Sequence, residues 1–180
     1  MVPEAELEPT EHGLFPKGEG WFVLNARDAQ WFYAPGRSAI CESEGDADFS
    51  QLGIFLSVLE PGAAMAMYHW EADQEDFLVL SGEALMIVEG EEHPLQQWDF
   101  VHCPAGTKHV IVGAGEAECV VLAVGAREHQ AGAGWGAYSV DEAAQRHGAG
   151  VDVETSDQHV AYARFTKRAP TRFREGWLPE

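Results

Sequence analysis

Basic side chains are scarce in this chain. Eleven Lys and Arg residues stand against 30 Asp and Glu residues, which gives a formal net charge of -19 at pH 7. Nucleic acids and anionic membranes bind basic surfaces, because their phosphates attract cations. The charge therefore predicts that the chain binds neither nucleic acid nor membrane. The main effect of the negative charge is to keep the protein soluble. The partner we expect is a small-molecule ligand or substrate.

Cysteine is scarce too, and long apolar runs are missing. Three cysteines cannot all pair within one chain, so Cys41, Cys103 and Cys119 favour a reducing compartment over a disulfide framework. The acidic N-terminus has no basic and apolar leader, which argues against a secretory signal. No apolar run approaches the roughly 20 residues that cross a bilayer. We therefore expect a cytoplasmic protein.

The remaining composition fits one domain with its own core, since 46% of 180 residues are hydrophobic. We expect an acidic, frayed tail at residues 1–20 and a barrel with N-terminal strands at residues 21–126. A C-terminal loop and helical extension should fill residues 127–180. In that extension Ser139 is a plausible N-cap for a helix over 140–147, and Ser156 for one that reaches about Lys167.

The centre of the chain is a series of short apolar runs separated by Gly, Pro and acidic turns. Many short strands with regular turn signals and little helix are typical of an antiparallel barrel or sandwich. The fold class that we predict is therefore all-β. The runs lie at residues 52–59, 77–80, 84–88, 100–103, 109–112 and 119–124.

Imidazoles and carboxylates are placed on these strands at a spacing of two. His69 and Glu71 share one parity with Met65, so one face of a single strand should carry them. Glu75 has the parity of the apolar positions that follow it, and His109 comes just after a Pro-x-Gly turn. Burying such groups is costly unless they are paired or bind a cation. The pattern indicates a divalent metal site inside the barrel.

The predicted ligands are His69, Glu71, Glu75 and His109. Two imidazoles and two carboxylates suit Mn²⁺, Fe²⁺, Ni²⁺ or Zn²⁺. The second carboxylate favours Mn²⁺ or Fe²⁺ among these four cations. The alternative is that neighbouring groups hold the histidines without a metal. Two nearby carboxylates would then repel each other, and one would stay protonated as part of an acid/base pair or a polar pocket.

These residues also resemble the first motif of the cupin superfamily. That motif has a glycine, two histidines separated by one residue, a glutamate and a closing glycine. The spacing between Gly62 and His69 is one residue longer than in the motif. His69 matches the first histidine. Glu71 stands in place of the second histidine, whereas Glu75 and Gly82 fit.

The second cupin motif is similar to residues 98–113. Pro104, Gly106 and His109 fit at the expected spacing, while Trp98 replaces the opening glycine and Gly113 replaces the closing asparagine. Residues 74–80 together with 98–100 resemble small single-domain bacterial cupins, some of which carry a sugar-phosphate isomerase label.

The resemblance implies a double-stranded β-helix, or jelly-roll barrel, with a metal at the matching positions. It implies a metal-dependent oxidoreductase of the dioxygenase kind or an isomerase, acting on a small polar metabolite. The alternatives are a non-catalytic small-molecule-binding cupin and a barrel without a working site. The fold alone does not decide among these functions.

The resemblance also implies a homodimer. The aromatic N-terminal strands, Trp21–Phe22 and Trp31–Tyr33, could cover a strand edge of the partner. The same residues could instead pack on their own barrel, and the sequence leaves both arrangements open.

Overall fold

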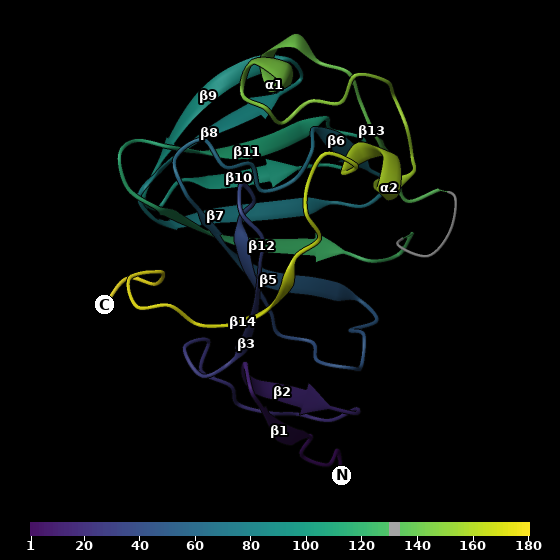
Figure 1. Cartoon of the computed structure of the whole chain (residues 1–180). Helices are drawn as coiled ribbons and strands as arrows, with labels where there is room; N and C mark the ends of the chain where they lie inside the picture. The colour runs from purple at the N-terminus through teal and green to yellow at the C-terminus, as the bar shows by residue number, and fades with distance from the viewer. Residues whose placement is uncertain (130–133) are drawn as a thin grey trace.

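Two antiparallel sheets pack face to face in the computed structural model, which describes residues 1–129 and 134–180 (Figure 1). The smaller sheet has the order β13 (Gly136–Tyr138), β6 (His69–Glu71), β11 (His109–Ala114), β8 (Glu83–Val88) and β9 (Glu91–Gln96). The larger sheet has the order β10 (Phe100–Cys103), β7 (Glu75–Ser81), β12 (Cys119–Ala126), β5 (Leu52–Leu59), β4 (Ala39–Glu42), β3 (Gln30–Tyr33) and β14 (Ala169–Arg172). The predicted all-β, antiparallel jelly-roll fold is confirmed.

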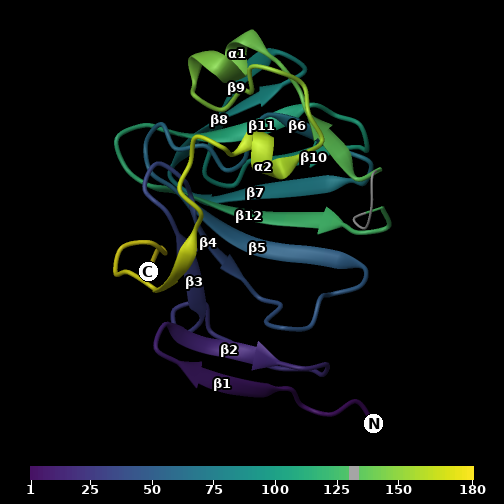
Figure 2. The same ribbon diagram turned by 45° about the vertical axis from the view of Figure 1, so that its right-hand side comes forward.

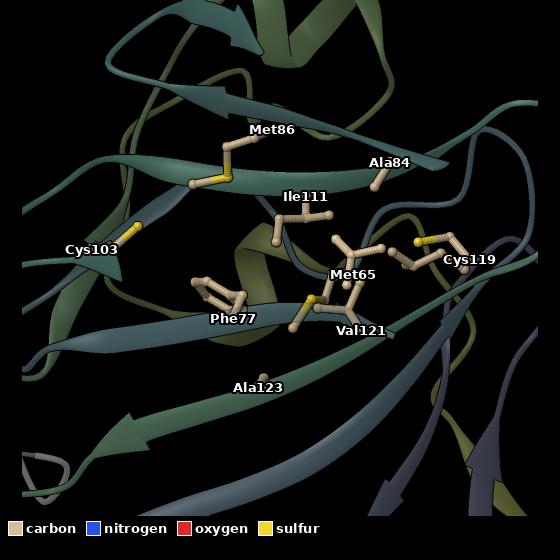
Figure 3. Close-up of a cluster of buried hydrophobic side chains, with 11 residues drawn as sticks. Met65, Phe77, Ala84, Met86, Cys103, Ile111, Cys119, Val121 and Ala123 are labelled. Carbon is tan, nitrogen blue, oxygen red and sulfur yellow. The ribbon is translucent and has the colours of Figure 1, made fainter. Parts of the chain in front are cut away.

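The main core lies between the two sheets, because alternate residues of each strand point inward. Figure 3 shows Phe77 of β7 and Ile111 of β11 among its members, with Met65 and Met86 beside them. The Phe77 ring lies 5.4 Å from the His109 ring, centroid to centroid. The main core therefore packs directly against the predicted metal site.

A second cluster covers the outer face of the larger sheet. Trp31 of β3 is completely buried there, with Trp177 at 5.0 Å and Phe173 at 6.0 Å between ring centroids. The C-terminal segment reaches this face because β14 pairs with β3. Of the two arrangements left open for the aromatic N-terminal residues, Trp31 adopts packing on its own barrel, while Trp21 stays 52% exposed.

The N-terminal segment is not a frayed tail, contrary to our expectation. It forms a hairpin of β1 (Glu6–Thr10) and β2 (Gly13–Lys17), which Figure 2 shows at the end of the molecule opposite α1 (Glu142–Arg146). The Thr10 hydroxyl donates to the Gly13 carbonyl across the turn (2.8 Å), and Lys17 pairs with Asp46 (3.1 Å). Backbone pairing needs no apolar periodicity, so the acidic composition hid this hairpin.

The single strand expected from Met65 to Glu71 is also wrong, because β6 begins only at His69. The Met65 N–H donates to Ile111 O (2.9 Å), whereas the Tyr68 N–H donates to Ala149 O (2.7 Å). The backbone before His69 thus bonds to unrelated segments. Met65 consequently joins the main core, and Met67 packs in a separate cluster.

Both helices are shorter than predicted. The N-cap of α1 is Asp141 rather than Ser139, because the Asp141 carboxylate accepts the Ala144 N–H (2.9 Å). Asp157, rather than Ser156, caps α2 (Gln158–Ala161), which ends well before Lys167. No helix in residues 1–129 or 134–180 is long and apolar enough to span a membrane.

Candidate metal centre

Three of the four predicted ligands meet between the two sheets. His69 of β6 and His109 of β11 are directly paired across the antiparallel ladder, and their ring centroids are 5.0 Å apart. Glu75 opens β7 in the opposite sheet and faces both rings. The cluster therefore depends on the packing of one sheet against the other.

The turn before β11 sets the position of His109. The Gly106 N–H donates to Glu71 O (2.7 Å), which ties this turn to the end of β6. Gly106 has a φ of +84°, a left-handed conformation that glycine adopts without steric cost. The Thr107 hydroxyl closes the turn by donating to Pro104 O (2.7 Å). The local pattern Pro-x-Gly thus places His109 beside His69.

Backbone carbonyls orient both imidazoles. The His69 Nδ1–H donates to Met67 O at 2.8 Å, and the His109 Nδ1–H donates to Thr107 O at 3.0 Å. A carbonyl oxygen only accepts, so Nδ1 of each ring carries the hydrogen. Each Nε2 is left facing Glu75. Metal-binding histidines are commonly held by such bonds from the second ring nitrogen.

The facing atoms lack ordinary partners. Glu75 Oε2 lies 3.3 Å from His109 Nε2 and 3.6 Å from His69 Nε2. Among the described residues, Glu75 Oε2 and His109 Nε2 are shielded from solvent and make no hydrogen bond. Metal–ligand bonds of about 2.1 Å separate neighbouring ligand atoms by about 3.0 to 3.4 Å. The donor types and their spacing therefore fit a divalent cation.

Without a metal ion, protons would have to supply the positive charge between Glu75 and the two imidazoles. Burial lowers the pKa of His69, but Glu71 and Glu75 outweigh it and raise that pKa to about 10. Burial likewise lowers the pKa of His109, but Cys103 and Glu75 raise it to about 9. Burial raises the pKa of Glu75, yet the two imidazoles hold it well below its usual range. The electrostatics of the cluster thus favour positive charge between these three side chains, carried either by protons or by a bound cation.

Glu71 stands slightly apart from this group. Its Oε1 lies 3.6 Å from His69 Nε2, but its side chain is 31% exposed, against 13% for Glu75. In the described part of the chain, the group of ligand atoms here that lie within 4.8 Å of one another comes from His69, Glu75 and His109 and does not include Glu71. Glu71 borders the same cavity, and its role as a ligand stays a prediction.

A cavity of about 220 Å³ adjoins the cluster. Tyr138 of β13, Gln158 of α2 and Tyr162 line it, together with Trp135 and Phe55. Sequence reasoning missed these walls. The aromatic pair Trp135 and Tyr138 after a glycine-rich stretch was the available signal, whereas nothing local marks Gln158.

Comparison with known proteins identifies the class of this fold. Residues 55–125, which include all four predicted ligands, match the family model described as a cupin domain. The chain thus carries a cupin domain over these residues, and the resemblance seen in the sequence is confirmed there. Among curated protein sequences, none matches the chain.

Several solved structures are similar. A candidate sugar phosphate isomerase from Acidithiobacillus ferrooxidans is 32% identical, over 52% of this chain and 62% of that one, with a TM-score of 0.46. A sugar phosphate isomerase from a cupin superfamily of Silicibacter pomeroyi is 28% identical, over 57% and 62%, with a TM-score of 0.44. The match therefore spans less than two thirds of each of these two proteins.

The polyketide cyclase RemF from Streptomyces resistomycificus has a higher TM-score of 0.52. It is 15% identical over 60% of this chain and 80% of its own. This likeness establishes the barrel fold that the two chains share.

Proposed function

We propose that this protein is a metal-dependent cupin that acts on a small polar metabolite. His69, Glu75 and His109 would hold the cation, and the observation that carries the proposal is the convergence of their unpartnered, buried atoms. Two histidines and one carboxylate with open positions are typical of non-haem iron oxygenases, so an oxidoreductase with Fe²⁺ is the first candidate, followed by Mn²⁺. When bound, the metal would supply Lewis acidity or redox chemistry.

The chain's own residues would bind and orient the substrate. Tyr138 and Gln158 offer polar groups at the cavity wall, and Trp135 with Phe55 limits the access of water. Glu71 supports an isomerase as the second candidate. It is a partly exposed carboxylate at the cavity, next to the proposed ligands but outside their group, where it can accept a substrate proton.

Elemental analysis of protein purified without added metal or an affinity tag tests the metal. We expect stoichiometric Fe, Mn, Ni or Zn in the wild type and its loss in His109→Ala. His93→Ala is the matched control, because His93 is exposed on β9. Substoichiometric metal, together with no binding of any of the four cations by calorimetry, would exclude the proposal.

Turnover then separates the functional classes. An oxidoreductase consumes O₂ or another oxidant, whereas an isomerase converts substrate without one. A non-catalytic binding cupin shows a ligand-induced rise in thermal stability and no turnover.

A homodimer in a reducing compartment such as the cytoplasm is also proposed. Trp98 and Phe100 support the dimer, because each is 67% exposed, and β10, which carries Phe100, is an edge strand of the larger sheet. Light scattering at micromolar concentration tests it, and a monomeric mass would reject it. Three buried, free thiols, Cys41, Cys103 and Cys119, support the compartment.

A further inference from the structure

A second cavity of about 520 Å³ lies between α2 and the strands β3 and β4. Three permanently cationic side chains line it, namely Arg37, Lys167 and Arg168, and the carboxylate among its lining residues is Glu42. The cavity is thus net positive in a chain of net charge -19. Its cations come from distant parts of the chain, so the fold has gathered them.

The two arginines of the cavity contact neutral groups. Arg168 donates to Ser38 O (2.9 Å) and to Ser38 Oγ (2.6 Å), which are neutral acceptors. The Arg37 guanidinium lies over the Tyr162 ring, 4.4 Å from its centroid. Neither guanidinium makes an ion pair with a carboxylate in the described part of the chain.

Some of the other arginines are paired with acids, whereas Arg164 also donates to backbone carbonyls, those of Gly148 and Gly150. Arg127 pairs with Glu44, and Arg146 pairs with Glu92 at 2.8 Å. Carboxylates are abundant in this chain, so a shortage of them does not explain why Arg37 and Arg168 lack an ion pair in the described residues. Half-buried cations that face one another are unfavourable unless an anion compensates them.

Their environment supports this view. Burial lowers the pKa of Arg37. Burial and, to a smaller extent, the nearby Arg37 charge lower the pKa of Arg168 to about 10. The Glu42 charge acts in the opposite direction on Arg168, but burial raises the pKa of Glu42 itself.

We propose that this cavity binds the phosphate or carboxylate group of a small organic anion. Arg37 and Lys167 contact the anion, while Arg168 contributes the donors that Ser38 leaves free. Guanidinium groups match the oxygens of both anions in a two-pronged geometry. Phe32, Ile40 and Phe165 form the apolar part of the lining, against which the organic portion of the ligand packs.

Calorimetric titration with inorganic phosphate and, separately, with acetate tests the site at constant ionic strength. We expect saturable binding of one or both anions, and the stronger one identifies the group. Arg37→Gln should weaken binding about tenfold, as the loss of a charged hydrogen bond predicts. Arg172→Gln on β14 is the control, because it removes the same charge from an exposed position outside the cavity. Binding to this variant should be unchanged.

Lys167→Gln provides a second variant if loss of the contact between Arg37 and Tyr162 prevents folding. Lys167 is exposed, and we expect its replacement to weaken binding while the unfolding temperature stays the same. Each titration is repeated after metal removal, and the binding should persist. The proposal is overturned if wild-type protein binds neither anion, if the cavity variants bind like Arg172→Gln, or if binding disappears with the metal. The last result would place the anion at the metal and would leave the metal proposal intact.

Discussion

The replacement Glu75→Gln tests the metal centre most directly. It keeps the size of the side chain and an oxygen that can coordinate, but it removes the negative charge nearest to both imidazoles. Glu75 Oε2 lies 3.3 and 3.6 Å from the two Nε2 atoms in a side chain that is 13% exposed. Removing one partner of a buried charge pair costs about 3 kcal/mol or more, so metal affinity should fall by about two orders of magnitude.

Glu71→Gln is the informative comparison. Glu71 is 31% exposed and approaches only His69 among the two histidines, at 3.6 Å. Solvent screens its charge, so its loss should cost less than about 1 kcal/mol, or roughly fivefold in affinity. The difference between the two variants follows from burial and the number of contacts, since their chemistry is the same.

The assay is competition for Mn²⁺ or Zn²⁺ against a chelating dye, with metal-stripped protein. Glu91→Gln corrects for the general loss of negative charge, because the Glu91 side chain is 81% exposed. Thermal unfolding verifies that each variant is folded. If Glu75→Gln loses no more affinity than Glu91→Gln, Glu75 does not bind the metal and the reasoning from its buried oxygen is wrong.

Three further predictions follow from the site and the packing. Glu71→His should retain the metal and shift preference toward Ni²⁺ or Zn²⁺ in competition titrations, and an unchanged ranking would put Glu71 outside the ligands. Metal affinity should rise with pH up to about 10, since the raised pKa values of His69 and His109 mean that a cation must displace their protons. A flat profile by dye competition at neutral to alkaline pH would contradict those protonation states. Trp177→Ala should lower the free energy of unfolding in urea by about 3 kcal/mol, because the ring is buried against Trp31. A loss below about 1 kcal/mol would mean that the C-terminal segment does not pack there.

The barrel could be predicted because its signals are local. The strands predicted at 52–59, 100–103 and 119–124 follow apolar runs bounded by turn residues, and the structure places β5, β10 and β12 there, with β12 continuing to Ala126. The hairpin of β1 and β2 and the strand β14 were missed. Backbone pairing stabilises both with little apolar patterning, and β14 even contains Pro170.

Sequence alone indicated the candidate metal cluster, because spacing within a strand and a Pro-x-Gly turn are properties of neighbouring residues. Tertiary structure decided that Glu75 of one sheet reaches His69 and His109 of the other, and that Glu71 stands apart. It also created the cationic cavity, where Arg168 contacts Ser38 across 130 residues of sequence. No local pattern encodes such a contact, since it exists only after β14 has paired with β3 and has brought the C-terminal segment onto the barrel.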